Sequence, residues 1–273
     1  MGLREVYRQV PISIRVESSR LTGIDDITDI DVGMFDWCNR RCSYCPVSAH
    51  PGQHSKNGDT ILSQSVWDRL VDNLAEMNFS GRVSPHHYNE PLLRYELVKE
   101  RLLELRAKVP KCKIVLYTNG DLLPKCFTGL IGVCDTIIVS FHEGRRNKEL
   151  LGLLNSRELN RDFRVEIKNV DSSEYGLLDR TNAISPQRIW HPTTCPNYDF
   201  GRNTLVINPR GQVVNCIQDH DADKVWGDLS SQSVQKIWGG KEYAVFRERR
   251  RTNDSLGLLG MCHSCLGVPI GLK

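Results

Sequence analysis

The sequence predicts an α/β fold: an open, partial (β/α) barrel of parallel strands, followed by a small C-terminal domain. Between residues 30 and 170, β-rich runs alternate with segments in which apolar residues recur at helical spacing. This alternation is typical of parallel strands joined by right-handed crossovers. The chain then changes to short runs, a hairpin turn and four cysteines. About five strand–helix repeats are too few to close an eight-stranded barrel of about 250 residues.

Each predicted barrel strand is a short run rich in β-branched or aromatic residues. We expect these strands at residues 30–35, 81–88, 113–117, 135–141 and 163–170. Between them, leucine and valine recur every three or four positions, which predicts helices. The expected helices cover residues 63–77, 92–108, 122–131 and 147–154, the first of them capped by Ser63 or Ser65.

The last third of the chain predicts a separate, loop-rich unit. Residues 204–207 and 212–216 flank the turn Asn208-Pro209-Arg210-Gly211, which is a hairpin signal. Helices are expected from Ser230 or Ser233 onward and over residues 241–251. We therefore divide the chain into a lead-in at 1–29, the barrel at 30–185 and a C-terminal domain at 186–273.

Composition narrows the class of protein. Hydrophobic residues make up 40% of the chain and charged residues 25%, which is ordinary for a globular protein. The net charge of +3 is too small to call for a nucleic-acid or membrane partner. No apolar run approaches the roughly 20 residues that cross a bilayer, and the N-terminus lacks the apolar core of a secretory signal. We expect a protein of the reducing cytoplasm.

Seven of the ten cysteines fall into two groups with metal-ligand spacing. The first group is Cys38, Cys42 and Cys45, and the second is Cys195, Cys216, Cys262 and Cys265. Cubic iron–sulfur clusters usually take four cysteine ligands, so three from one loop would leave one iron open to a ligand that is not protein. A zinc knuckle is the alternative. The remaining cysteines, Cys112, Cys126 and Cys134, are expected to be buried as small apolar side chains.

Polar motifs follow the predicted strands at the ends where barrel sites form. In a parallel α/β barrel, functional groups collect at the C-terminal ends of the strands. The first cysteine group follows the first strand, and Tyr88-Asn89-Glu90-Pro91 follows the second. Thr118-Asn119-Gly120 follows the third strand, and Ser140 and His142 end the fourth. One rim should therefore carry all of these groups.

The run Cys-Asn-Arg-Arg-Cys-Ser-Tyr-Cys at residues 38–45 resembles the cluster-binding motif of the radical S-adenosylmethionine (SAM) superfamily. The resemblance implies a [4Fe–4S] cluster with SAM on its open iron. Asn89-Glu90-Pro91 is similar to the superfamily's Gly-Gly-Glu-Pro motif, which binds the amino group of SAM, although Tyr88 and Asn89 replace the two glycines. The resemblance also implies that Tyr44 lies near the adenine and that Asn119 and Ser140 contact the ribose or carboxylate.

The second cysteine group resembles the Twitch domain, a shortened SPASM domain that holds one auxiliary [4Fe–4S] cluster. With four protein ligands such a cluster would have no open iron, so the resemblance implies an electron acceptor or donor. A structural zinc would use the same four cysteines.

Residues 79–84, 90–93 and 117–121 are also similar to the aminocyclitol dehydrogenases of the superfamily, which oxidise an alcohol of 2-deoxy-scyllo-inosamine to a ketone in butirosin biosynthesis. The resemblance implies an alcohol-oxidising enzyme of antibiotic biosynthesis. Its substrate would be an aminocyclitol or aminosugar, and a flavodoxin or ferredoxin would supply single electrons. Arg180 falls close to a family arginine position and is the candidate for orienting or deprotonating the substrate.

Three other functions remain open from the sequence. A radical SAM epimerase would quench the substrate radical with hydrogen, often from a cysteine, but Cys112, Cys126 and Cys134 are expected far from the rim. A peptide-maturation enzyme of this kind often carries an N-terminal peptide-binding domain, and fewer than 40 residues precede Cys38. A zinc-binding interaction module would contain zinc and no iron.

Overall fold

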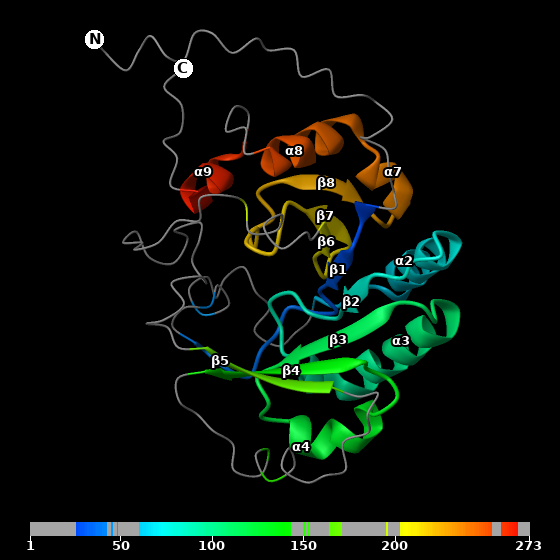
Figure 1. The fold of residues 1–273 in the computed structure, drawn as a ribbon, viewed down its shortest axis with the longest axis vertical. Coiled ribbons are helices and arrows are strands. Elements are labelled where there is room, and N and C mark those ends of the chain that lie inside the picture. The colour runs from blue at the N-terminus through cyan, green and yellow to red at the C-terminus, as the bar shows by residue number, and fades with distance from the viewer. Residues whose placement is uncertain are drawn as a thin grey trace, which may run out of the picture.

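The computed structural model describes residues 26–42, 45, 48, 60–142, 150, 152, 164–170, 195, 203–252 and 258–266. Its central element is an eight-stranded sheet in the order β5-β4-β3-β2-β1-β6-β7-β8 (Figure 1). The strands are β1 (Asp29–Val32), β2 (Arg82–Ser84), β3 (Lys113–Thr118), β4 (Thr136–His142), β5 (Arg164–Val170), β6 (Thr204–Ile207), β7 (Gln212–Val214) and β8 (Val225–Asp228).

Strand β1 lies in the middle of the sheet. On one side Ile30 is opposite Val83 of β2, and on the other side it is opposite Leu205 of β6, and both pairings are parallel. The sheet continues in parallel through β3, β4 and β5, whereas β6, β7 and β8 pair antiparallel. The predicted partial barrel is confirmed. In addition, the hairpin expected in a separate C-terminal domain continues the barrel sheet.

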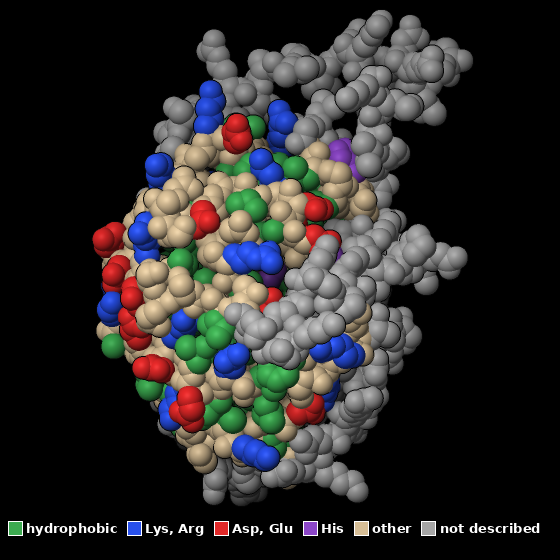
Figure 2. All heavy atoms as spheres, turned by 180° about the vertical axis from the view of Figure 1, so that it is seen from behind, with side chains coloured by type: hydrophobic (Ala, Val, Ile, Leu, Met, Phe, Trp, Pro, Cys, Tyr) green, Lys and Arg blue, Asp and Glu red, His purple; other side chains and the backbone are tan. Residues whose placement is uncertain are grey.

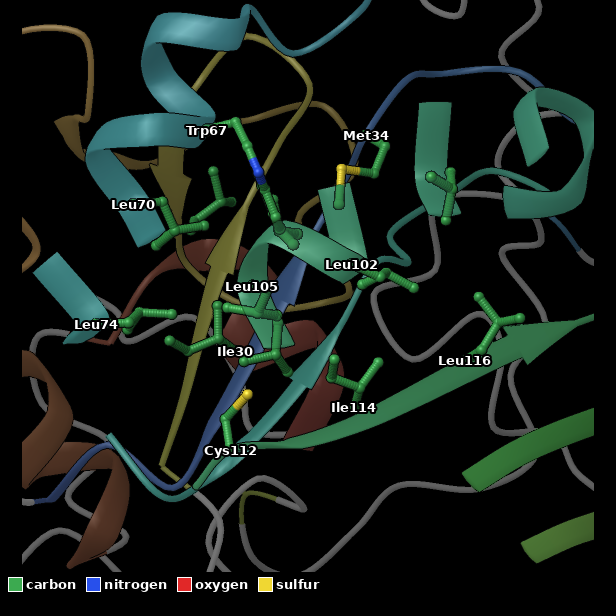
Figure 3. Packing of buried hydrophobic residues seen from close by; sticks show 14 of the residues in the cluster. Ile30, Met34, Trp67, Leu70, Leu74, Leu102, Leu105, Cys112, Ile114 and Leu116 are labelled. Carbon is green, nitrogen blue, oxygen red and sulfur yellow. The ribbon is translucent and has the colours of Figure 1, made fainter. Parts of the chain in front are cut away.

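Helices cover one face of the barrel strands, and a second set covers the hairpin (Figure 1). The first set is α2 (Gln64–Glu76), η3 (Pro91–Arg94), α3 (Tyr95–Lys108), α4 (Leu123–Cys126) and η4 (Phe127–Leu130). The second set is α7 (Val234–Trp238), α8 (Lys241–Arg251) and α9 (Gly260–Leu266). The main core lies between the sheet and the helices α2 and α3, and its side chains converge there (Figure 3): Ile30, Leu70, Leu74, Leu102, Leu105, Ile114 and Leu116. Full burial of each such side chain stabilises the fold by about 1.5–3 kcal/mol.

Serine side chains cap the first turns of α2 and α7, and a buried asparagine joins these two helices. The Ser63 hydroxyl accepts a hydrogen bond from the Val66 N–H at 3.3 Å, and so caps α2 as the sequence predicts. Ser233 caps α7 in the same way. The buried Asn73 side chain of α2 accepts a hydrogen bond from the Val234 N–H at 2.9 Å, which fastens the start of α7 to the barrel.

Several predicted boundaries differ from the structure. The strand expected at 81–88 contains only residues 82–84, because the chain then turns into the polar loop that leads to Glu90. The helix expected at 92–108 begins as the 3₁₀ turn η3, since Glu90 accepts from the Leu92 N–H and Pro91 follows at the first position. Strand β8 and helix α9 were not expected. The lead-in before residue 26, most of the helix expected at 147–154 and the domain boundary at 185/186 lie outside the described residues.

The surface carries charges of both signs. On the face shown in Figure 2, Lys and Arg side chains are interspersed with Asp and Glu side chains rather than gathered into one patch. In the part of the chain that the structure describes, no helix is long and apolar enough to cross a membrane.

Candidate functional site

The loop after β1 carries the first cysteine group. The backbone N–H of Arg40 donates to the Cys38 sulfur at 3.4 Å, and the Cys45 N–H donates to the Cys42 carbonyl at 3.0 Å. Burial raises the pKa of the Cys38 thiol, with the neighbouring Cys42 adding to the rise. N–H donors to sulfur and closely spaced thiols suit a loop whose sulfurs bind a metal centre as thiolates. The donor set therefore fits the cluster that the sequence predicts.

The cysteine loop is fastened to the end of β3 by a charged pair that the sequence did not single out. Arg40 forms a two-pronged contact with the Asp121 carboxylate, with Nε–Oδ2 at 2.8 Å and Nη2–Oδ1 at 2.5 Å. The Asn39 amide donates to the same carboxylate at 3.0 Å. Two parallel Arg–carboxylate bonds fix orientation as well as distance. They hold the backbone on which Cys38 and Cys42 stand.

Glu90 is buried at the centre of this rim, with 2% of its surface exposed. One carboxylate oxygen accepts from the Thr118 hydroxyl at 2.7 Å and the Leu92 N–H at 3.2 Å, and the other from the Asn119 N–H at 2.7 Å. A carboxylate has about four acceptor positions, so these three donors leave one for a further group. Burial raises the pKa of Glu90 to about 7, although the three hydrogen bonds act in the opposite direction.

Asn119 links Glu90 and the end of β3 to the cysteine loop. Its amide donates to the Asn39 side chain at 2.8 Å and lies 4.0 Å from the Cys38 sulfur. The next residue, Gly120, has a φ of +82°, and a Cβ there would meet Leu150 and Val139 at under 3 Å. Only glycine fits this turn. The predicted Asn119 is thus beside the cysteines, where it is held on both sides.

The other predicted SAM contacts differ in how far the structure describes them. Asn89 is buried, and its side chain accepts from the His87 N–H at 3.0 Å. Ser140 is half-buried near the end of β4, opposite Lys168 of β5. Tyr44 and Arg180 lie outside the described residues.

The sheet face opposite the helices is charged near β1 and β2. Asp29 and Asp31 alternate along β1 with the core residues, and Arg82 lies on β2 beside them. Arg82 pairs with Asp29 at 2.5 Å, lies 4.0 Å from Asp31, and donates to the Tyr117 hydroxyl at 2.8 Å. Side chains alternate between the two faces of a strand, so Asp29 and Asp31 are expected on the same face. No sequence motif marked them as candidate site residues. Hydroxyl and amino groups of a polar ligand would find donors and acceptors here.

The second cysteine group gathers beside α8 and α9. Burial raises the pKa of the Cys262 thiol to about 11, and Cys195 and Cys265 are near enough to add to the rise, while Arg250 opposes it. The Asn215 amide donates to the Cys262 sulfur at 3.5 Å, and the Gln218 N–H donates to the Cys216 sulfur at 3.4 Å. These donors again suit thiolate ligands.

Tyr88 joins the two cysteine regions. Its hydroxyl donates to the backbone carbonyl of Ile217, which follows Cys216, and its ring packs edge-on against His220 at 5.8 Å. Two residues further on, the Glu90 N–H donates to the carbonyl of Trp37, which precedes Cys38, at 3.0 Å. The substitution of glycine by tyrosine at position 88 was the only sequence signal for this link.

The described residues do not include a ready-made metal site, because no three His, Cys, Asp or Glu side chains among them are arranged to hold an ion. The ligand roles of the seven cysteines therefore stay predictions. The other three cysteines are buried as expected, with exposures of 0% for Cys112, 8% for Cys126 and 4% for Cys134.

Comparisons with known proteins match both cysteine regions. The model described as "Radical SAM superfamily" matches residues 32–167, and the SPASM model, described as "Iron-sulfur cluster-binding domain", matches residues 195–266. A Niallia circulans protein described as S-adenosyl-L-methionine-dependent 2-deoxy-scyllo-inosamine dehydrogenase is 26% identical over 248 residues, which cover 88% of this chain and 93% of that protein.

Solved structures also match this chain over most of its length. BtrN in complex with AdoMet and 2-DOIA superimposes with a TM-score of 0.68 and 25% identity, over 82% of this chain and 87% of that one. Native anSMEcpe with bound AdoMet shares the fold, with a TM-score of 0.54 and 12% identity over 86% and 94% of the two chains. The two domains indicate SAM and two iron–sulfur clusters as cofactors. The chain is a radical SAM protein with a C-terminal SPASM-type iron–sulfur cluster-binding domain.

Proposed function

We propose that this enzyme is a dehydrogenase that oxidises a secondary alcohol of a small polar substrate, of the aminocyclitol or aminosugar type, to a ketone. Cys38, Cys42 and Cys45 would hold the first cluster, which with SAM and one electron from an external reductant would supply a 5′-deoxyadenosyl radical and release methionine. The second cysteine group would hold the auxiliary cluster, which would supply an acceptor for one electron. The substrate alcohol would lose a hydrogen atom to the deoxyadenosyl group, an electron to the auxiliary cluster and its hydroxyl proton to a base or water, and a carbonyl would remain.

The observation that carries this proposal is the short segment from Tyr88 to Glu90, which contacts both cysteine regions. Its Tyr88 end is bonded to the residue after Cys216, and its Glu90 end to the residue before Cys38. A substrate bound beside this segment would be near the radical source and the electron acceptor together. Proximity of both groups is what an oxidation needs, since the substrate radical must lose its electron before it takes up hydrogen.

The charged sheet face supports a substrate with several hydroxyl or amino groups. Asp31 is a carboxylate for an ammonium or hydroxyl donor, while Arg82 and the Tyr117 hydroxyl serve acceptor groups. The similar protein from Niallia circulans is described as acting on 2-deoxy-scyllo-inosamine, an aminocyclitol, and this is the first substrate to test. By the same likeness we propose a role in antibiotic biosynthesis.

Two of the three described cysteines outside the two groups argue against an epimerase. Cys112 precedes β3 and Cys134 precedes β4, so both lie at the N-terminal ends of strands, opposite to the end that leads to Asn119. Neither thiol is placed to hand a hydrogen atom to a substrate on the rim.

We assign the first cluster to Cys38, Cys42 and Cys45 and the auxiliary cluster to Cys195, Cys216, Cys262 and Cys265. We further propose that Asn89 and Glu90 receive the SAM amino group, that Asn119 and Ser140 contact its ribose or carboxylate, and that Tyr44 lies near the adenine. Arg180 is proposed to orient or deprotonate the substrate hydroxyl. The enzyme is proposed to work in the cytoplasm with a flavodoxin or ferredoxin as electron source.

The test uses the anaerobically purified, cluster-loaded enzyme with SAM, a chemical reductant and 2-deoxy-scyllo-inosamine deuterated at the oxidised carbon. We expect one SAM consumed for each ketone formed, with the deuterium in 5′-deoxyadenosine. Recovery of an inverted alcohol that carries solvent hydrogen would identify an epimerase instead. Purified protein with zinc and without iron would overturn the radical mechanism itself.

A further inference from the structure

A buried arginine lies directly behind the second cysteine group. Arg250, on α8, is 5% exposed, and its guanidinium donates to the backbone carbonyl of Asn215 at 3.2 Å. Its charge also rests 5.1 Å from the centre of the Phe246 ring. An arginine keeps its charge in proteins, so this is a fixed positive charge in a largely dehydrated place.

Asn215 links Arg250 to the Cys262 sulfur. Asn215 is 1% exposed, and while its carbonyl accepts from Arg250, its side-chain amide donates to the Cys262 sulfur at 3.5 Å. Its own N–H is held by the Asp219 carboxylate at 3.0 Å, which fixes the backbone from the other side. Cys262 thus faces an oriented N–H donor with a positive charge one residue behind it.

Positive charge and N–H donors have a known direction of effect on iron–sulfur centres. A cluster bound by four thiolates is negatively charged and becomes more so when reduced, so a nearby cation stabilises the reduced form more than the oxidised form. Hydrogen bonds to the sulfurs act in the same direction. Because Arg250 and Asn215 are buried, the effect of this charge is weakly screened by water and salt.

We propose that Arg250, acting through Asn215, raises the reduction potential of the auxiliary cluster and so makes that cluster an electron acceptor. Arg250 is a positioning and charge-supplying residue, since it touches no reacting atom. The inference rests on the proposed assignment of Cys195, Cys216, Cys262 and Cys265 to that cluster. It gives a role to an arginine that is buried beside cysteines, in a helix whose last residue, Arg251, is exposed and paired with Glu248.

The experiment is a redox titration followed by electron paramagnetic resonance. It uses the full chain carrying Cys38→Ala, Cys42→Ala and Cys45→Ala, which assembles only the auxiliary cluster. In this background, Arg250→Gln is expected to lower the midpoint potential by at least a tenfold change in the reduction equilibrium, about 59 mV for one electron. Arg250→Lys, which keeps the charge, should recover most of the shift. Arg251→Gln removes the same charge from the exposed end of the same helix and should shift the potential far less.

Equal shifts for Arg250→Gln and Arg251→Gln, or none, would overturn the inference. If Arg250→Gln does not retain its iron, the comparison passes to Asn215→Leu, which removes the N–H donor without changing the charge. An unchanged potential in that variant would also refute the role of Asn215. Failure of the cluster assignment is a different result, because Cys262→Ala would then keep the iron of the auxiliary site.

Discussion

Replacing Glu90 by glutamine should remove a pH dependence of SAM binding that the buried carboxyl creates. With a pKa of about 7 before SAM binds, Glu90 is mostly ionised at pH 7.5 and mostly protonated at pH 6. We propose that Glu90 receives the ammonium of SAM, which favours the ionised carboxylate, so at pH 6 binding must first release a proton. Linkage then weakens the affinity for SAM by about eightfold between pH 7.5 and pH 6. Glu90→Gln should bind about tenfold or more weakly at pH 7.5, since a hydrogen bond to a charged group contributes about 1.5–3 kcal/mol, and its affinity should stay flat with pH.

The assay is the change that SAM causes in the spectrum of the reduced first cluster, titrated at both pH values with iron content checked for each variant. Glu104→Gln is the matched control, because Glu104 lies on α3, accepts from the Trp67 indole at 3.0 Å and is remote from the rim. It should keep the wild-type pH profile. A parallel loss of affinity toward pH 6 in wild type and Glu90→Gln would show that another group titrates, and the reasoning about Glu90 would be wrong.

Asp121→Asn should loosen the cysteine loop by removing the charged partner of Arg40, at a cost of about 1–3 kcal/mol, and lower the iron retained by the first cluster after desalting; Asp72→Asn breaks only the exposed pair with Lys108 and should retain full iron. Cys262→Ala should lower the iron from roughly eight to roughly four per chain, whereas Cys112→Ala should leave it unchanged, and equal iron in both would contradict the ligand assignment. Tyr88→Phe should raise the ratio of 5′-deoxyadenosine to ketone, because the segment after Cys216 loses its hydrogen bond to the segment that contains Glu90. An unchanged ratio with normal iron content would show that Tyr88 has no role in coupling SAM cleavage to substrate oxidation.

The order of elements follows closely from the sequence because strand and helix periodicities are local. Helix α8 begins and ends at the residues expected, and β3 and β5 do so to within one residue. Boundaries fail where a tertiary contact decides them. The strand at Arg82–Ser84 stops early because the chain turns to bring Glu90 to the end of β3, and no local sequence pattern predicts that turn.

The candidate site shows the same division. The first three cysteines and the Asn-Glu-Pro and Thr-Asn-Gly motifs are short local patterns, so they can be recognised in the sequence. The contacts that join these motifs bridge long separations: Arg40 to Asp121, Tyr88 to Ile217, and Asn215 to Cys262. Such pairs are set by how the strands assemble, and a single sequence does not reveal them. Helix α9 was missed for a related reason, since its glycine, histidine and serine are weak helix formers that tertiary contacts override.

The pairing of β1 with β6 has a consequence for how the protein is made. Ile30 needs Leu205 as its neighbour, so one edge of the first strand stays open while the ribosome adds the intervening chain. Contacts this distant in sequence form late and slowly. The cysteine loop directly after β1 therefore has an unfinished support until the last third of the chain has emerged. We therefore expect iron–sulfur assembly machinery to meet a stable first site only after synthesis is nearly complete.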